Sequence, residues 1–467
     1  MNNLSRRAVL AASLAAAFVP RRARAAAAPI VGCDARWEWL SALARAAGFE
    51  EYQGGLAEWT GPLDTRLARL RSHPVVSRLR RARDASGVSY DALPSLALHL
   101  VPGADGGPPT AWSLAVAATP WPSGLDVRWQ GVDLAALLRE LGSAAKKAGF
   151  AELWSDSGAL RARAEAAAAG AATGLDLGWY EAFCGFPTPG AVRVVPALGS
   201  RPSNYAARRH GTDPEIAAFL AVSSTDAGLE VDASVLVHEI GHAFVNPLVS
   251  ENRAVLEPPG QRVYAAVKER MDASAYGAWD TVVVESVLRA VTVRYAEAHG
   301  GPAAARSELA RHLDRGFPWT VVLADSMRDY EADRARYATL GEWSVPLAAV
   351  LTVIAEEEEA RAAGRPHVVS ISVADGADDV DPALPALVVV FDRPMRDRSW
   401  SVVGDPAEMP DGDTPHYEEG GTRFVMPWRL SPGRSYRLGL NGGRSRAFQS
   451  AEGVPLEPVL LRFRTRG

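Results

Sequence analysis

The 467-residue chain is 48% hydrophobic and 22% charged, a balance that predicts a globular protein with enough apolar side chains for two or three domains. Its formal net charge is −5, so the overall charge gives no indication of a nucleic-acid partner. The sequence has two cysteines and no C-x-x-C pair, which argues against a zinc site made of thiolates.

The first 28 residues have the three-part layout of an export signal. Twin arginines at positions 6 and 7 precede an uncharged apolar stretch, 11–19, and an Ala-x-Ala cleavage pattern follows at 23–25. We therefore expect 1–28 to be a Tat-type signal peptide and the protein to be periplasmic or extracellular. The apolar stretch is too short to span a bilayer, and no later segment has 18 uninterrupted apolar residues, so we expect no transmembrane segment in the mature chain.

The two cysteines leave two alternatives open. Because an exported protein can oxidise its thiols, a disulfide between Cys33 and Cys184 is an option that the sequence does not decide. Residues 30–33, Ile-Val-Gly-Cys, resemble a lipobox, which offers the alternative of a lipoprotein anchored at Cys33. We favour cleavage upstream, because an adequate site precedes the lipobox.

Helical and extended patterns alternate after the signal. The spacing of apolar residues predicts helices over 37–47, 65–83, 133–148 and 158–170, and strands over 191–198 and 218–224. We expect 218–224 to be an edge strand that can hold an extended substrate backbone. Tyr205, at the end of the turn-rich loop 199–205, is a candidate donor to an oxyanion, although a packed aromatic is the ordinary interpretation.

An H-E-x-x-H motif at 238–242 lies inside an apolar run. Residues four apart lie on one face of a helix, so His238 and His242 can present two imidazole nitrogens to one metal ion. Glu239 is then placed to act as general base on a water molecule. The buried character of the run supports this, because two histidines and a glutamate in a buried helix need partners. The motif predicts a zinc site and a hydrolase. Asn246-Pro247 predicts that the helix ends or tilts soon afterwards.

A zinc site needs a third protein ligand. Further helices are predicted over 263–271, 279–298, 303–314, 321–337 and 347–363. Glu285 lies in the apolar section of the second of these, and we predict it to be the third ligand, with Arg289 one turn later holding a nearby or substrate carboxylate. An ordinary ion pair between Glu285 and Arg289 is the alternative. The competing ligands are Glu251, Glu269, Glu297, His299 and His210.

After Gly364 the pattern changes to short alternating strands separated by turns. Strands are predicted over 368–373, 387–391, 423–426, 436–440 and 460–465. Strands of this length and spacing over 367–467 predict a β-sandwich. His416 and the acidic turn 411–413 could bind a cation, but an exposed turn explains them as well.

Several segments together resemble a bacterial family of exported zinc metallopeptidases whose activity is inferred. These are VGCDARWEWL, AAGFEEY, HEIGHAFVNP, VVVESVLRAVTVRY, GFPW and YEADRARYATLGEWSVP, within 30–355. The family signature is HEFGH or HEFSH followed by x-F-V-N-P, with a later E-S-x-V-R-A helix. The departures are an isoleucine, Ile240, where an aromatic is usual, and Cys33 where the family more often has Asp or Val.

The resemblance implies a gluzincin-like domain with three metal ligands. His238, His242 and Glu285 match the ligands, and Glu239 matches the catalytic carboxylate. Asn246, Arg289 and Tyr276 stand where the family tends to show the same residue types, without assigned roles. Within 367–467, the segments 391–395, 430–436, 453–456 and 463–465 resemble bacterial Ig-like domains of cell-surface and S-layer proteins, which usually space, stabilise or bind.

The predicted fold is therefore an α+β zincin-like, mainly helical metallopeptidase domain over 29–363, followed by an all-β Ig-like sandwich over 367–467. The predicted function is an exported zinc metallopeptidase with Zn²⁺ as cofactor and a peptide or protein substrate, in which the Ig-like module can contact the cell envelope. One alternative is an envelope binding or scaffolding protein with a structural or inactive metal site. Another is a zinc amidase acting on cell-wall amide bonds, because hydrolysis of these bonds and of peptide bonds needs the same activated water.

Overall fold

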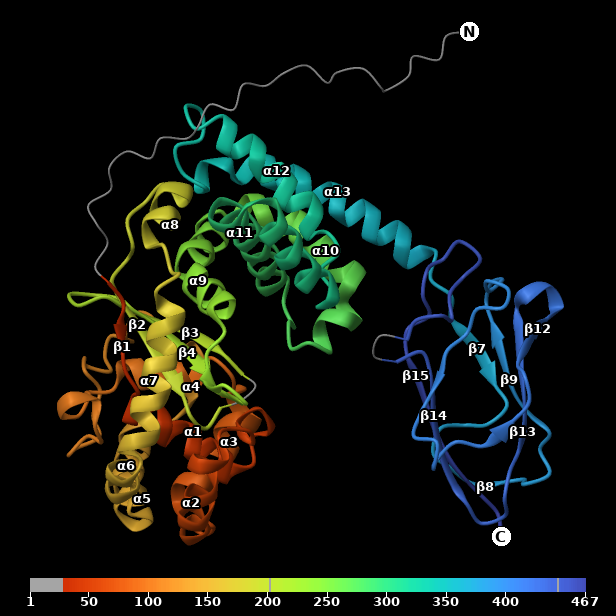
Figure 1. The fold of residues 1–467 in the computed structure, drawn as a ribbon, viewed down its shortest axis with the longest axis horizontal. Helices are drawn as coiled ribbons and strands as arrows, with labels where there is room; N and C mark the ends of the chain where they lie inside the picture. Colours follow the sequence, from red (N-terminus) through yellow and green to blue (C-terminus); the bar gives the residue numbers. More distant parts are fainter. Residues whose placement is uncertain (1–27, 201–202, 443–444) are drawn as a thin grey trace. The chain divides into compact units, whose positions relative to one another are not determined.

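The computed structural model describes residues 28–200, 203–442 and 445–467. The predicted signal peptide 1–28 therefore lies almost entirely outside the described residues. The described chain divides into two compact units, one formed by 28–257 and 280–350, the other by 258–279 and 351–467 (Figure 1). A mainly helical N-terminal region is followed by a C-terminal region rich in strands, as predicted. The division differs from the expected boundary after residue 363, because two helical segments join the strand-rich unit.

The helices of the chain follow one another with few strands between them. Their bounds are α1 Ala35–Ala47, α2 Ala57–Leu67, α3 Pro74–Ser86, α4 Ala92–His99, α5 Leu134–Ala148, α6 Phe150–Asp156, α7 Gly158–Ala172, α8 Leu177–Cys184, α9 Ala233–Glu251, α10 Arg253–Asp272, α11 Trp279–Asp314, α12 Thr320–Ala332 and α13 Ser344–Ala363. The strands of the first unit are β1 Ile30–Val31, β2 Ala191–Ala197, β3 Tyr205–Arg209, β4 Glu215–Ala221, β5 Ser223–Thr225 and β6 Gly228–Glu230.

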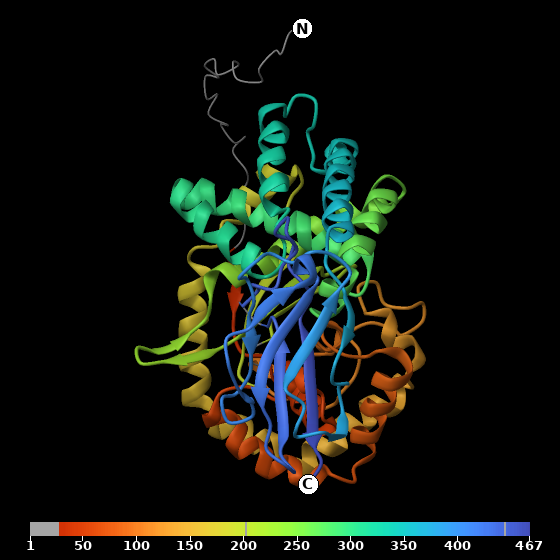
Figure 2. The same ribbon diagram turned by 90° about the vertical axis from the view of Figure 1, so that its right-hand side faces the viewer.

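A four-stranded sheet in the order β1-β2-β4-β3 organises the first unit. The three strands β1, β2 and β4 are parallel, and β3 pairs antiparallel with β4 along the outer side. Tyr205 and Phe219 project from one face and pack against Trp37 of α1. Arg208 projects from the opposite face and reaches α9. The sheet therefore lies between α1 and α9 (Figure 1). The β5–β6 hairpin passes α7 in both views (Figure 1, Figure 2).

Two sequence predictions for this unit were wrong. The single helix expected over 65–83 is divided into α2 and α3, because His73 precedes Pro74 and takes an extended conformation. The strand expected at 218–224 is β4, which lies inside the sheet; the outer strand beside it is β3, in a region that was expected to begin as a loop. The segment 205–209 pairs antiparallel with β4 and becomes the outer strand. The local sequence pattern does not predict this pairing.

The second unit contains two sheets that enclose one apolar core. One has the order β10-β14-β15-β8 and the other β11-β13-β9-β7, with β12 also pairing β13. Their bounds are β7 Val368–Ile371, β8 Ala377–Val380, β9 Ala386–Phe391, β10 Val402–Val403, β11 Asp411–Gly412, β12 His416–Glu418, β13 Arg423–Arg429, β14 Ser435–Leu440 and β15 Val459–Thr465. Buried side chains from both sheets, such as Val389 and Leu438, form the core. All five predicted strands are present.

Both cysteines are buried and unbridged, so the disulfide left open by the sequence is absent from the described chain. The strand β1 precedes Cys33 and pairs with β2, so lipoprotein processing at Cys33 would remove a strand from the sheet. This does not favour the lipoprotein alternative. Among the described residues, we find no helix that is both long enough and apolar enough to cross a membrane.

Candidate metal centre

Helix α9 carries the H-E-x-x-H motif and is well defined at its start. The Asp232 carboxylate caps it by accepting hydrogen bonds from the backbone N–H groups of Ser234, at 2.8 Å, and Val235. Apolar residues within and beside the motif, among them Leu236, Ile240 and Phe244, are fully or almost fully buried. The helix is therefore fixed in the core, and its histidines have little freedom to turn away.

The helix continues through Pro247 to Glu251, so it does not end at Asn246-Pro247, the first of the two outcomes predicted there. A proline in a helix interior has no N–H to donate to the carbonyl four residues earlier. Here that carbonyl belongs to Ala243, and the Arg208 guanidinium of β3 donates to it at 3.2 Å. The hydrogen bond that Pro247 removes is thus replaced from the neighbouring strand.

Gly241 allows α11 to approach α9 at the level of the motif. A β-carbon at this position would collide with Cδ1 of Leu288 and lie 3.0 Å from the Tyr180 hydroxyl. Tyr180 in turn donates a hydrogen bond of 2.8 Å to the Val237 carbonyl. Gly241 lies on the same face of α9 as the two histidines, so the close approach brings α11 directly over them.

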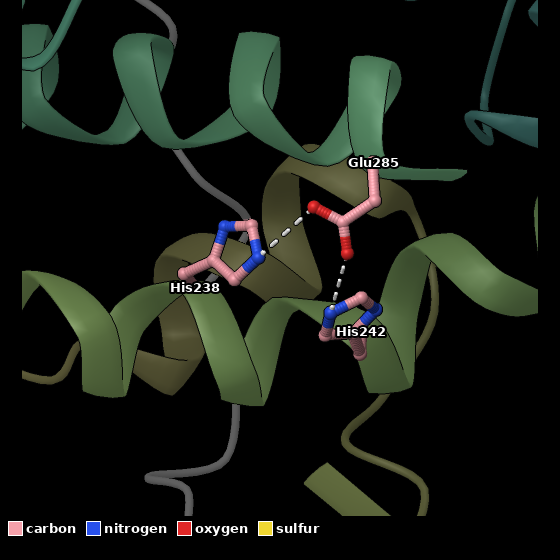
Figure 3. Close-up of side chains that lie close together, drawn as sticks. All are labelled: His238, His242 and Glu285. Carbon is pink, nitrogen blue, oxygen red and sulfur yellow. Dashed lines mark ion pairs between the residues drawn. The ribbon is translucent and has the colours of Figure 1, made fainter. Parts of the chain in front are cut away.

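Glu285 of α11 points at both histidines, as Figure 3 shows. Its Oε2 lies 3.5 Å from Nε2 of His238, and its Oε1 lies 3.4 Å from Nε2 of His242. One ligand atom from each residue lies within 4.8 Å of the others. Bonds near 2 Å to a tetrahedral ion place neighbouring ligand atoms about 3.3 Å apart. The predicted convergence of these three residues is confirmed, and their spacing fits a metal ion.

The state of the two imidazoles also fits a cation. His242 Nδ1 lies 3.0 Å from Oδ1 of Asn246, which can only accept, so Nδ1 carries a proton and Nε2 is the nitrogen that faces Glu285. Burial is the main cause that lowers the pKa of His238 to about 4, which leaves this ring neutral near pH 7. Neutral imidazole with an exposed lone pair is the form that binds metal.

The carboxylates of the site differ in their environments. Burial raises the pKa of Glu285, but the Arg289 guanidinium that pairs with it at 2.8 Å, together with its contacts to His238 and His242, outweighs burial and holds that pKa well below its usual range. Burial raises the pKa of Glu239 to about 7. Among the described residues, we find no hydrogen bond or ion pair to the Glu239 carboxylate. Glu285 is thus fixed as an anion, while Glu239 is poised to gain or lose a proton.

Arg289 pairs with Glu285, its Nη2 donating to Oε2 at 2.8 Å. The ion pair considered as an alternative to metal binding therefore exists. It uses Oε2 on the side of Arg289, while both oxygens of Glu285 also face the histidines. The two interpretations are compatible, because a metal-binding carboxylate commonly has a hydrogen-bonded partner behind it.

Each of the remaining candidate residues has its own surroundings. Tyr205 is buried in β3, with its ring against Trp37 and Tyr52, the packing of a core aromatic. Tyr276 lies in the loop after α10, in the other unit, and its backbone N–H donates to Met271. The competing ligands do not join the His238–His242–Glu285 group: Glu297 pairs with Arg294 and Arg328, His299 with Asp176, and Glu251, Glu269 and His210 are exposed.

Three residues close to the centre were missed by sequence reasoning. Thr292, Glu308 and His312 lie in a buried network with Arg289. The sequence offered one weak signal, the i, i+4 spacing of Glu308 and His312. That signal is common on solvated helices, and the predicted helix boundary near Gly300 separated these residues from Glu285.

Comparison with family models finds a similarity over one part of the chain. Residues 225–350, which contain all of the cluster, match a family described as a domain of unknown function, DUF4932. A comparison with curated proteins found no match. Among solved structures, the S-layer protein rSbsC is matched at 13% identity with a TM-score of 0.18, over 50% of this chain and 34% of that one. The chain thus spans about a third of the S-layer protein's length.

Proposed function

We propose that this protein is an exported zinc-dependent hydrolase, and specifically a metallopeptidase. The observation that carries the proposal is the number of protein ligands. Within the described ranges, the cluster has three ligand residues, His238, His242 and Glu285, and no fourth His, Cys, Asp or Glu joins them. Structural zinc sites are closed by four protein ligands, whereas catalytic sites use three and leave one position for water or substrate.

Glu239 supplies the proton chemistry in this proposal. A divalent cation held by the three ligands would polarise a water molecule and a substrate carbonyl. Glu239 follows His238 directly, and its pKa of about 7 lets it accept a proton from water and return it to the leaving amine near neutral pH. Burial of the carboxylate supports this role, because burial disfavours the charged form and makes the carboxylate a stronger base.

The edge of the sheet supports a peptide as substrate. Strand β3 is the outer strand on the side of α9, and Arg208 from this strand contacts the motif helix. Among the described residues no further strand pairs with β3, so an extended peptide could add to the sheet there and bring a carbonyl toward the histidines. The proposal also includes a zincin-like fold for the first domain, an Ig-like fold for 367–467 and export by the predicted signal peptide.

The test is metal analysis of the purified chain, with a peptide-library digest run beside two variants. Glu239→Gln should keep its zinc and lose turnover by about 100-fold or more, because the general base is gone. Glu251→Gln, which changes an exposed carboxylate near the end of the same helix, is the matched control and should behave as wild type.

Two other outcomes would each favour another function, and a third would change the mechanism. If X-ray absorption spectroscopy showed zinc bound by four protein donors, and the protein had no turnover, the scaffolding alternative would be indicated. Cleavage of cell-wall fragments without cleavage of any peptide in the library would indicate the amidase. Undiminished turnover by Glu239→Gln would remove this residue from the mechanism.

A further inference from the structure

A buried chain of side chains extends from Glu285 through Arg289 and His312 to Glu308. Arg289 Nη2 donates to Glu285 at 2.8 Å, and its Nη1 lies 3.3 Å from Nδ1 of His312. Nε2 of His312 lies 2.9 Å from Oε1 of Glu308. None of the four side chains is more than 9% exposed. The carboxylate proposed to bind the metal is therefore the end of a chain that is shielded from water.

The turn at Gly301 makes this chain possible. Helix α11 changes direction there, where φ is +71°, a conformation that favours glycine. In an unbroken helix, Thr292 and His312 would be about 30 Å apart, at 1.5 Å per residue. Instead the Thr292 hydroxyl oxygen lies 2.9 Å from Nε2 of His312. The second part of α11 thus packs back along the first and places His312 beside Arg289.

The hydrogen bonds fix where the protons lie. Arg289 can only donate, so Nδ1 of His312 accepts and its proton is on Nε2. The Thr292 hydroxyl donates to the Arg289 carbonyl at 2.9 Å, so its oxygen and Glu308 are both left to accept from Nε2. Burial and the charge of Arg289 lower the pKa of His312 to about 3. His312 is therefore neutral and held in one tautomer.

Arg289 is committed to this chain. Its side chain is 2% exposed, and its guanidinium lies over the Phe317 ring with 4.3 Å between the central carbon and the ring centroid. Its two terminal nitrogens face Glu285 and His312. A guanidinium held on its face and at both terminal nitrogens is poorly placed to bind a substrate carboxylate. This favours a role toward Glu285 over the substrate role considered from the sequence.

We propose that His312 and Glu308, acting through Arg289, are positioning residues that hold the Glu285 carboxylate toward His238 and His242 for metal binding. The inference rests on the proposed function. Glu308 orients the imidazole, the imidazole orients the guanidinium, and the guanidinium fixes one oxygen of Glu285. Partners of this kind are typically worth about 10- to 100-fold in metal affinity.

The experiment measures the dissociation constant of Zn²⁺ on the metal-free full-length chain, by competition with a chromophoric chelator. His312→Leu should raise it by about 10- to 100-fold. His312→Asn, whose amide oxygen can still accept from Arg289, should recover part of the loss. His299→Leu is the matched control, because His299 also lies in α11 and is hydrogen-bonded, but to Tyr295 and Asp176. This control should change affinity by less than about 3-fold, within the spread of distant substitutions.

A second arm guards against simple loss of folding. Glu308→Gln is nearly isosteric and should raise the dissociation constant by about 5-fold or more, since it removes the charge that orients His312. The absorption spectrum of the Co²⁺-loaded His312→Asn variant should differ from wild type, because the carboxylate is held differently. Variants that stay folded without metal, and that bind Zn²⁺ as tightly as wild type, would overturn this inference. A wild-type chain that binds no Zn²⁺ would instead overturn the proposed function.

Discussion

Leu288 packs over Gly241 so closely that a β-carbon on the glycine would collide with its Cδ1. Leu288 is one turn from Glu285 on α11, and Gly241 lies between the two histidines of α9. The contact therefore sets the distance between the two helices at the level of the metal ligands.

Gly241→Ala should weaken both folding and metal binding. The added methyl group must displace Leu288 or the Tyr180 hydroxyl, which would move α11 and Glu285 away from the histidines. Overpacking of this kind costs about 1–3 kcal/mol in free energy of unfolding, measurable by urea denaturation, and zinc affinity should fall with it. Gly170→Ala in α7, where a β-carbon meets nothing within 4 Å, is the control. Equal zinc affinity in Gly241→Ala and wild type would contradict the role of the contact.

Asn246→Leu should reduce zinc affinity by about 10-fold. This is the low end of the range for a residue that is hydrogen-bonded to a metal ligand, because Asn246 is exposed. The amide oxygen accepts from Nδ1 of His242 at 3.0 Å and so directs the Nε2 lone pair toward Glu285. Asn246→Asp keeps an acceptor at this place and should bind zinc at least as well as wild type. Chelator competition measures both. If Asn246→Leu bound zinc normally, this hydrogen bond would not orient the ring.

Arg208 and Pro247 should be coupled in stability. In the wild type, Arg208→Ala removes the hydrogen-bond donor of the Ala243 carbonyl and should cost about 1–2 kcal/mol. In a Pro247→Ala background, the restored N–H at position 247 can pair with that carbonyl, so the same substitution should cost about 1 kcal/mol less. A double-mutant cycle by urea denaturation measures the difference. The cycle repeated with Arg209→Ala, which removes pairs with Asp213 and Glu215, should show no coupling.

Glu38 should make the protein less stable as pH rises. Its side chain lies in α1 at 0% exposure and accepts a hydrogen bond of 2.7 Å from the Leu198 backbone N–H. Burial raises its pKa from 4.5 to about 8. Between these values the folded state keeps a proton that the unfolded state has released, so stability is full below about pH 4.5 and is lost progressively up to about pH 8.

Glu38→Gln should remove this loss. The amide keeps an oxygen for Leu198 and cannot ionise, so the variant should match wild type near pH 5 and exceed it near pH 8 by an amount on the order of 4 kcal/mol. Urea denaturation at a series of pH values measures the gap. Glu58→Gln, a change in an exposed ion pair with Arg163, should leave the pH dependence unchanged. A constant gap between Glu38→Gln and wild type would show that Glu38 is ionised in the folded protein.

The sequence alone determined that His238 and His242 share a helix face with Glu239 beside them. This follows from helix geometry, which depends on residues within one turn. The strand-rich end of the chain was predictable for the same reason, because alternation of apolar and polar residues is a local property. Glu285 was chosen among several acids because it lies in an apolar stretch where an unpaired charge is costly.

Only the tertiary structure decided which groups meet across distant segments. The split of the 65–83 helix could have been read from Pro74, but the edge position of β3 depends on pairing with β4. The continuation of α9 through Pro247 depends on a guanidinium from that same strand. The Glu308–His312–Arg289 chain exists because α11 turns back at Gly301. Packing between segments far apart in the sequence sets these contacts, and local spacing carries no record of it.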